Sequence, residues 1–304
     1  MKKEDEVHRP PIRREEKGFR LPRWAVSFIS GGVAGTVAKS SVAPLERVKI
    51  LFQIRSKLYP YTGIVDTMRS IIRQEGYTAL WKGNTATVVR IFPYAAVQFL
   101  SYEEYRKVLR KVMPGNTTLV NLIGGGAAGA TCVLCTYPLD VVRVRLAVSA
   151  KTGEYNGILH CITSIIRHKG FTGLFSGIWP TLMGIIPYAA VNFATYEGLK
   201  TLVQPEGDLS VTQKLFCGGL AGAIGQTIAY PLDVVRRQMQ TAGLKDVHDF
   251  AHRNTFSALK SILHNEGAIG LFRGLSINYV RVGPQVAISF TTYETVKKYL
   301  ETKT

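Results

Sequence analysis

Apolar stretches of nearly membrane-spanning length alternate with shorter polar and basic segments along the chain. Two of the clearest cover residues 119–137 and 215–230, and a membrane-spanning helix needs roughly 20 mainly apolar residues. Most Lys and Arg residues lie between such stretches or at their ends. Hydropathy alone leaves two classes open, because buried helices of a large soluble protein would show the same pattern.

Three sequence elements recur in a fixed order and divide the chain into three units. The first has the form Pro-x-acid-x-x-base and begins at Pro44, Pro138 and Pro231, with spacings of 94 and 93 residues. An acid-Gly and aromatic-base-Gly element follows each one, and a Tyr-acid-x-x-base element closes each unit. The second copy of the middle element departs from this form at Lys169 and Ser176. Repetition at this period predicts tandem structural repeats.

Each unit predicts a spanning helix, a loop with a short amphipathic helix, and a second spanning helix. The first helix carries glycines four residues apart, as at Gly31 and Gly35, a spacing that lets helices approach closely in lipid. We therefore expect an all-α membrane protein with six transmembrane helices in three tandem repeats and pseudo-threefold symmetry. The repeats are expected over residues 24–112, 117–203 and 211–301, after a disordered tail at 1–23. Short interfacial helices are expected over about residues 64–75, 157–168 and 253–265.

The charge balance adds a second constraint. The 304 residues include 38 Lys and Arg against 21 Asp and Glu, a formal net charge of +17. Such an excess can indicate nucleic-acid binding, but no nucleic-acid motif is found and the charge is not gathered on one helix or arm. Loops facing anionic headgroups account for it better, together with a pathway for anions. We therefore expect membrane lipid as a partner, and no nucleic acid.

The two alternatives to a transporter are an enzyme and a soluble basic binding protein. An enzyme is not expected, because the sequence shows no nucleophile–base pair, metal cluster or Gly-rich phosphate loop; no metal or cofactor is expected either. The Cys132-x-x-Cys135 pair lacks a second ligand pair and reads as small helix-packing residues. A soluble basic binding protein is the other alternative, and alkaline carbonate would extract it from membranes.

Broken symmetry indicates where a substrate binds, since structural residues should repeat three times and an asymmetric substrate's contacts need not. One mid-helix position reads Arg90, Gly184 and Arg281 in the three units, and a second position carries Lys39 in the first unit only. Charges within a membrane are costly and usually functional, and the planar fork of Arg suits phosphate. The alternative is structural ion pairing, but no acidic partner is evident at their depth. Gly184 leaves room for a flat group, such as a base ring, beside Ile185.

The repeated elements resemble the signature of the mitochondrial carrier family over about residues 24–300. This resemblance implies a matrix gate of three ion pairs, Glu46–Arg143, Asp140–Arg236 and Asp233–Lys49, with Gln238 as a bracing glutamine. It also implies an opposing cytoplasmic gate in the Tyr-acid-x-x-base elements. That gate would use Glu103, Arg106, Glu197, Lys200, Glu294 and Lys297.

The resemblance extends to substrate and location. Glycine followed by an aliphatic residue, here Gly184-Ile185, accompanies adenine-nucleotide-type substrates in this family. Short stretches of the sequence around the repeated elements resemble the coenzyme A transporter branch. These features imply a multi-pass antiporter of the mitochondrial inner membrane that carries coenzyme A by alternating access. The counter-substrate would be ADP or adenosine 3′,5′-bisphosphate. An ATP-Mg/phosphate-type or other adenine nucleotide exchanger is the alternative. We expect a monomer, with cardiolipin among the lipids it contacts.

Overall fold

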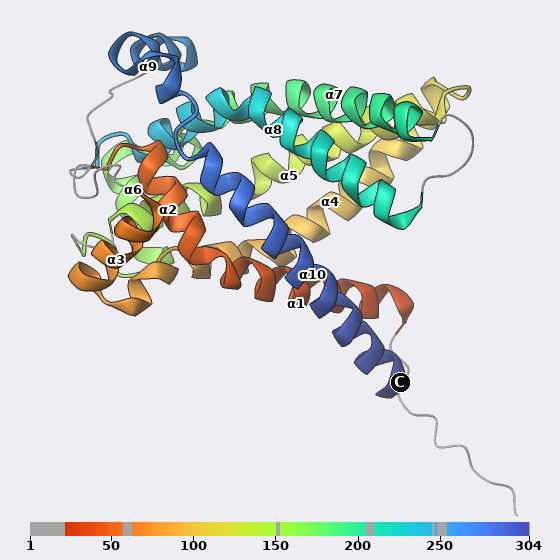
Figure 1. Cartoon of the computed structure of the whole chain (residues 1–304), viewed down its shortest axis with the longest axis horizontal. Coiled ribbons are helices and arrows are strands. Elements are labelled where there is room, and N and C mark those ends of the chain that lie inside the picture. Colours follow the sequence, from red (N-terminus) through yellow and green to blue (C-terminus); the bar gives the residue numbers. More distant parts are fainter. Residues whose placement is uncertain are drawn as a thin grey trace, which may run out of the picture.

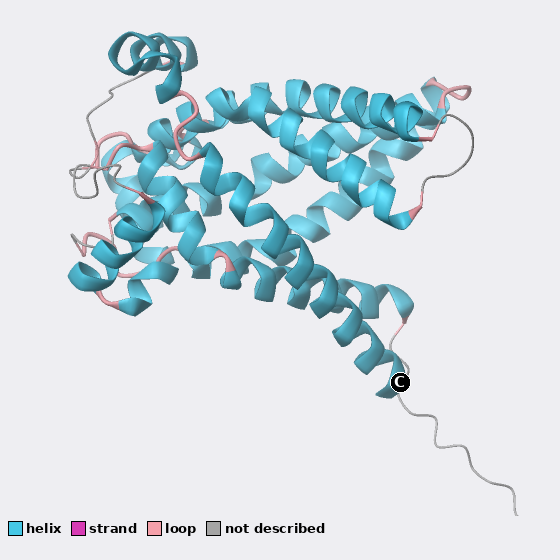
Figure 2. Ribbon diagram, viewed as in Figure 1, coloured by secondary structure: helices cyan, strands magenta, loops and turns pink. Residues whose placement is uncertain are grey.

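The structure is a computed structural model that describes residues 22–56, 63–149, 153–204, 210–244, 247 and 254–303. Apart from its last two residues, the predicted disordered tail lies outside the described part, and α1 begins at Arg23. Figure 2 shows that the described chain is almost entirely helical. The elements in chain order are α1 (Arg23–Ser41), α2 (Ala43–Gln53), α3 (Ile64–Glu75), η1 (Tyr77–Trp81), α4 (Asn84–Val112), α5 (Thr117–Val148), α6 (Ile158–Lys169), η2 (Phe171–Phe175), α7 (Ile178–Val203), α8 (Val211–Thr241), α9 (Thr255–Gly270) and α10 (Leu275–Lys303).

Each repeat has the predicted order of long helix, short linking helix and long helix. The linking helices α3 and α6 agree with the expected ranges to within one residue. The third range, α9, is longer because it comprises two helical pieces that meet at a kink at Gly267, whose φ of 67° is not helical. Figure 1 places α2, α3, α6 and α9 at one end of the bundle, which we call the signature end because it holds the Pro-x-acid-x-x-base elements.

The signature prolines affect the three helices differently. A break at Val42, two residues before Pro44, divides the first long helix into α1 and α2. Pro138 and Pro231 instead lie inside the continuous helices α5 and α8. A proline ring removes one backbone hydrogen bond and bends a helix, so all three elements can turn at this level while only the first is interrupted.

Three described helical stretches are long and apolar enough to cross a membrane by length and composition alone. They are α5, residues 171–203, and residues 212–241 of α8. The long helices α4 and α10 have 29 residues each but are more polar, and they carry Arg90 and Arg281. Each repeat nevertheless supplies two long helices, so the repeat pattern gives six spanning elements where composition alone identifies three.

Glycines let the second helix of a repeat begin against the signature element of the next repeat. Gly83 and Gly177 precede α4 and α7 with φ of 84° and 81°, a region that favours glycine. A Cβ on Gly83 would lie 2.5 Å from the carbonyl oxygen of Arg143, and one on Gly177 would lie 2.9 Å from that of Arg236. This close approach fixes the signature cations relative to the neighbouring helices.

The buried Arg47 side chain joins four elements at the signature end. Its Nε donates to the carbonyl of Ala147 at 2.9 Å and its Nη1 to that of Ala79 at 2.7 Å. Its Nη2 pairs with the Glu75 carboxylate at 2.8 Å. Because Arg47 is only 1% exposed, these bonds satisfy a charge that would otherwise be costly to bury. They hold α2 against α3, η1 and α5.

Cys132 of the Cys132-x-x-Cys135 pair is buried, whereas Cys135 is exposed. All four are free thiols, and three of them are buried. Burial raises the pKa of the Cys161 thiol in the linking helix α6 to about 12, so at neutral pH it is protonated. A protonated, buried thiol is a poor nucleophile and a poor metal ligand.

Candidate functional site

Three ion pairs join neighbouring repeats at the signature end. Each links the acid of one Pro-x-acid-x-x-base element to the base of another, so together they tie the three repeats into a ring. The pairs are Arg143–Glu46 at 2.7 Å, Arg236–Asp140 at 2.6 Å and Lys49–Asp233 at 3.1 Å. In this structure the bundle is therefore closed at the signature end.

Two glutamines add hydrogen bonds to this ring. Gln53 donates to Asp233 at 2.9 Å and Gln240 donates to Asp140 at 2.8 Å. The expectation that Gln238 braces a pair is not met, because among described residues its amide donates only to the backbone carbonyl of Gln53. The bracing position thus lies nine residues after the signature proline. Aligning the three repeats would have indicated this position. The residue nine after the signature proline is Gln53 in the first repeat, Ala147 in the second and Gln240 in the third.

Aromatic rings support two of the three signature cations. The Arg236 guanidinium lies over the Tyr137 ring at 5.6 Å, and the Lys49 ammonium lies over the Tyr230 ring at 5.3 Å. Each tyrosine directly precedes a signature proline, and each pairs with the cation of a neighbouring repeat. Cation–π contacts of this kind stabilise a partly desolvated charge.

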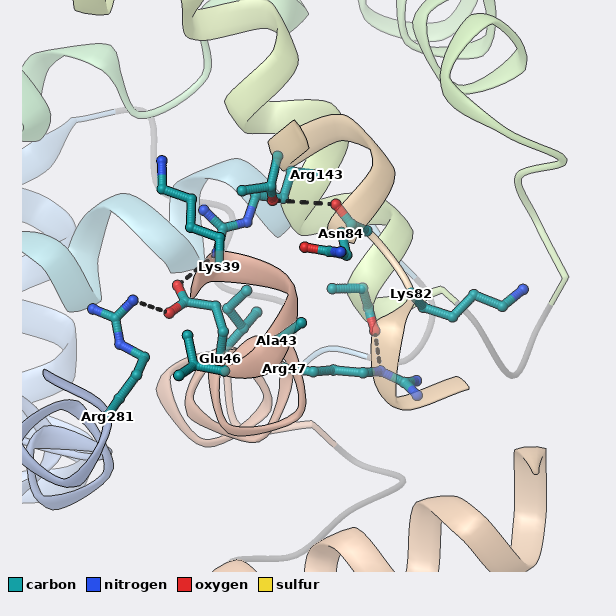
Figure 3. A pocket seen from close by; sticks show the side chains of 13 residues that line it. Lys39, Ala43, Glu46, Arg47, Lys82, Asn84, Arg143 and Arg281 are labelled. Carbon is teal, nitrogen blue, oxygen red and sulfur yellow. Dashed lines mark hydrogen bonds and ion pairs between the residues drawn. The ribbon is translucent and has the colours of Figure 1, made fainter. Parts of the chain in front are cut away.

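The two arginines identified by broken symmetry are not free of acidic partners, contrary to expectation. Arg90 pairs with Asp140 at 3.1 Å, and Arg281 pairs with Glu46 at 2.6 Å. Figure 3 shows Glu46 between Arg281 and Arg143, bound to both. The two arginines lie on different helices from these acids. The sequence alone therefore did not show that the arginine side chains extend to the same depth in the bundle as the carboxylates.

The other predicted substrate residues line the space beside this ring. Lys39 borders a pocket together with Glu46 and Arg281, and it has no ion pair or hydrogen bond within the described part of the chain. Gly184 and Ile185 border a separate cavity of about 230 Å3. A Cβ on Gly184 would meet only Leu232, at 3.8 Å, so the absence of a side chain keeps this cavity open.

Cations outnumber carboxylates around the ring. Arg237, which sequence reasoning missed, approaches both Asp140 at 3.3 Å and Asp233 at 3.8 Å. The seven cations are Lys39, Lys49, Arg90, Arg143, Arg236, Arg237 and Arg281, and the three carboxylates are Glu46, Asp140 and Asp233. The excess of four positive charges suits an anionic ligand with several phosphate oxygens.

The opposite end of the bundle is in a different state. Within the described residues, no ion pair joins the six charged side chains of the Tyr-acid-x-x-base elements to one another; Lys297 instead pairs with Glu301 in its own helix at 3.9 Å. In Figure 1 the ends of α8 and α10 lie well apart here. The structure therefore combines a closed signature end with an open tyrosine end.

Three tandem units, a ring of ion pairs and an interior rich in cations define a membrane carrier of anions rather than an enzyme. The family described as mitochondrial carrier protein matches residues 21–113, 115–207 and 207–304. The chain belongs to the mitochondrial carrier family. It is a transporter, and its relatives are mitochondrial membrane proteins.

Individual relatives are similar over nearly their whole length. "Mitochondrial substrate carrier family protein P" of Dictyostelium discoideum is 45% identical, covering 91% of this chain and 95% of its own length. "Mitochondrial carrier protein CoAc1" of Arabidopsis thaliana is 43% identical, with 92% and 91% covered. "Solute carrier family 25 member 16" of Mus musculus is 42% identical, with 91% and 88% covered.

Proposed function

We propose that this carrier exchanges coenzyme A for an adenine nucleotide, such as ADP or adenosine 3′,5′-bisphosphate, across the mitochondrial inner membrane. The observation that carries the proposal is the excess of four positive charges around the ion-pair ring. Coenzyme A has a diphosphate and a 3′-phosphate monoester, which together carry about four negative charges at neutral pH. Relatives whose names include the letters CoA agree with this assignment.

The predicted site residues take complementary roles in this proposal. Arg90, Arg281 and Lys39 bind phosphate oxygens, and the arginines can each donate two parallel hydrogen bonds. The open cavity at Gly184 and Ile185 receives the adenine ring. These contacts are stronger in a partly dehydrated cavity than in water, because the effective dielectric constant is lower.

Substrate binding is coupled to the gate through shared arginines. In this structure Arg90 and Arg281 pair with Asp140 and Glu46, the same carboxylates that bind Arg236 and Arg143. Substrate phosphates compete for Arg90 and Arg281 and so rearrange the ring that keeps the signature end closed. The signature ring acts as the matrix gate and the Tyr-acid-x-x-base elements as the cytoplasmic gate. Coupling requires that the ligand bind the two states with different affinity.

Lipid contact is proposed at the signature end. A groove beside Trp81 and Lys82 reaches Gly157, which precedes the first turn of α6. A helix N-terminus next to a lysine favours a phosphate group, so an anionic phospholipid such as cardiolipin fits this groove. We propose that a single copy of the chain forms the transport pathway.

Ligand-induced stabilisation tests the substrate assignment. A ligand that binds only the folded carrier raises its stability by about 2.7 kcal/mol at a concentration 100 times its Kd, so the detergent-purified protein should melt at a higher temperature with coenzyme A. We expect coenzyme A and adenosine 3′,5′-bisphosphate to raise Tm more than inorganic phosphate at equal concentration. A larger shift with ATP-Mg than with coenzyme A would favour the ATP-Mg/phosphate-type exchanger instead.

A further inference from the structure

A further cavity lies between α8 and α10, apart from the pocket at Glu46, the cavity at Gly184 and the groove beside Trp81. It measures about 590 Å3 and is lined mainly by apolar or small residues. Gly218, Gly222 and Gly283 border it, and a Cβ built on any of them would meet no atom within 4 Å. The two helices of the third repeat therefore leave unfilled space between them, while α10 packs mainly along α1.

The residue that borders this space from α10 differs among the three repeats. In the first repeat, Phe92 of α4 packs so closely on Gly32 of α1 that an added Cβ would lie 2.4 Å from its ring. The equivalent positions of Phe92 are Ile186 in the second repeat and Gly283 in the third. At this position the third repeat has no side chain, whereas the first repeat has a ring that packs on the facing helix. Because this position is not repeated, it has the broken symmetry expected of a substrate contact.

The cavity shares lining residues with the two pockets of the proposed substrate site. Arg281 borders both this cavity and the pocket at Glu46. Tyr188 and Gln226 border both this cavity and the one at Gly184. The phosphate-binding and base-binding regions therefore each adjoin this cavity, and an arm of a molecule bound at both can reach it past the shared side chains.

The geometry points to the pantetheine arm of coenzyme A as the occupant of the α8–α10 cavity. This inference rests on the proposed function. The arm is uncharged and largely aliphatic, which matches a mainly apolar lining, and its two amides need hydrogen-bond partners. Gln226 can supply one, since it has no hydrogen bond to another described residue and borders the cavity. ADP and adenosine 3′,5′-bisphosphate have no such arm and leave the cavity empty.

The Gly283→Phe variant tests this assignment, because it places in the third repeat the side chain that the first repeat already carries. We expect coenzyme A uptake into liposomes to fall about tenfold or more, as overpacking by a bulky ring excludes the arm. Exchange of ADP and of adenosine 3′,5′-bisphosphate should stay within about twofold of the original protein, a change worth less than about 0.5 kcal/mol. The matched control is Ile186→Phe, at the equivalent position of the second repeat, which should transport all three alike.

Three results would be decisive. Equal coenzyme A uptake by Gly283→Phe and the original protein would overturn the assignment of the arm. Parallel loss of all three substrates would overturn it too, since the cavity would then serve helix movement or lipid. If the original protein exchanged ADP but took up no coenzyme A, the proposed function itself would fail, independently of the variant.

Discussion

The Arg90→Ala/Arg281→Ala double variant is expected to lose coenzyme A exchange by about 100-fold or more in kcat/KM. Each arginine is proposed to bind phosphate by charge-assisted hydrogen bonds, and one such bond contributes about 1.5–3 kcal/mol. Loss of two therefore corresponds to a decrease of at least about two orders of magnitude. Initial rates of labelled coenzyme A uptake over a concentration series in liposomes measure it.

A matched control separates substrate binding from the loss of charge. Arg110→Ala/Lys298→Ala removes one exposed cation from each of the same two helices, α4 and α10, and should transport normally. The arginines also contact Asp140 and Glu46, so Tm should be recorded for each variant. A fully active double variant would show that these arginines serve packing only.

The Asp140→Asn variant is expected to abolish exchange and to lower Tm. The Asp140 carboxylate, 2% exposed, accepts bonds from Arg90, Arg236 and Arg237 and from the amide of Gln240. Neutralising it leaves three guanidinium groups close together without their shared counter-charge. Breaking a buried charge cluster in this way costs about 3–5 kcal/mol, so the closed signature end should be rarely populated. ADP/ADP exchange in liposomes and thermal unfolding in detergent measure both effects.

The control for this substitution is Glu104→Gln. Glu104 pairs with Lys107 at 2.7 Å, but both side chains are more than 60% exposed, and such surface pairs contribute about 1 kcal/mol or less. Exchange by Glu104→Gln should match that of the original protein. If Asp140→Asn exchanged ADP as fast as Glu104→Gln, the ion-pair ring would not be part of the transport cycle.

Much of the fold was predictable because the same sequence elements recur in three tandem repeats. A single Pro-x-acid-x-x-base element would suggest little, but three ordered copies carry the resemblance to the mitochondrial carrier family. That resemblance implied that Glu46, Asp140 and Asp233 pair with cations of neighbouring repeats, as they do in the structure. The linking helices followed from the same repetition, with α3 as predicted and α6 shifted by one residue. Repetition turns local pattern into information on long-range contacts.

The asymmetric contacts were harder to predict. Arg90 and Arg281 reach Asp140 and Glu46 from other helices, and pairing of this kind depends on helix rotation and relative depth, which a single sequence does not encode in its periodicity. Arg237 offered a usable signal, since Ile50 and Val144 occupy its equivalent positions. A charge that replaces two aliphatic residues indicates a local role, and here it lies between two gate carboxylates.

Exchange by the purified carrier tests the central claim most directly. Labelled coenzyme A would be added to liposomes that contain the protein and either ADP or no internal substrate. We predict saturable uptake that depends on internal ADP, because an exchanger opens its cavity to one side at a time and must carry a substrate in each direction. The opposite result would be that ADP-filled liposomes take up labelled ATP or ADP readily but take up no coenzyme A. That result would contradict coenzyme A exchange and identify a carrier of adenine nucleotides alone.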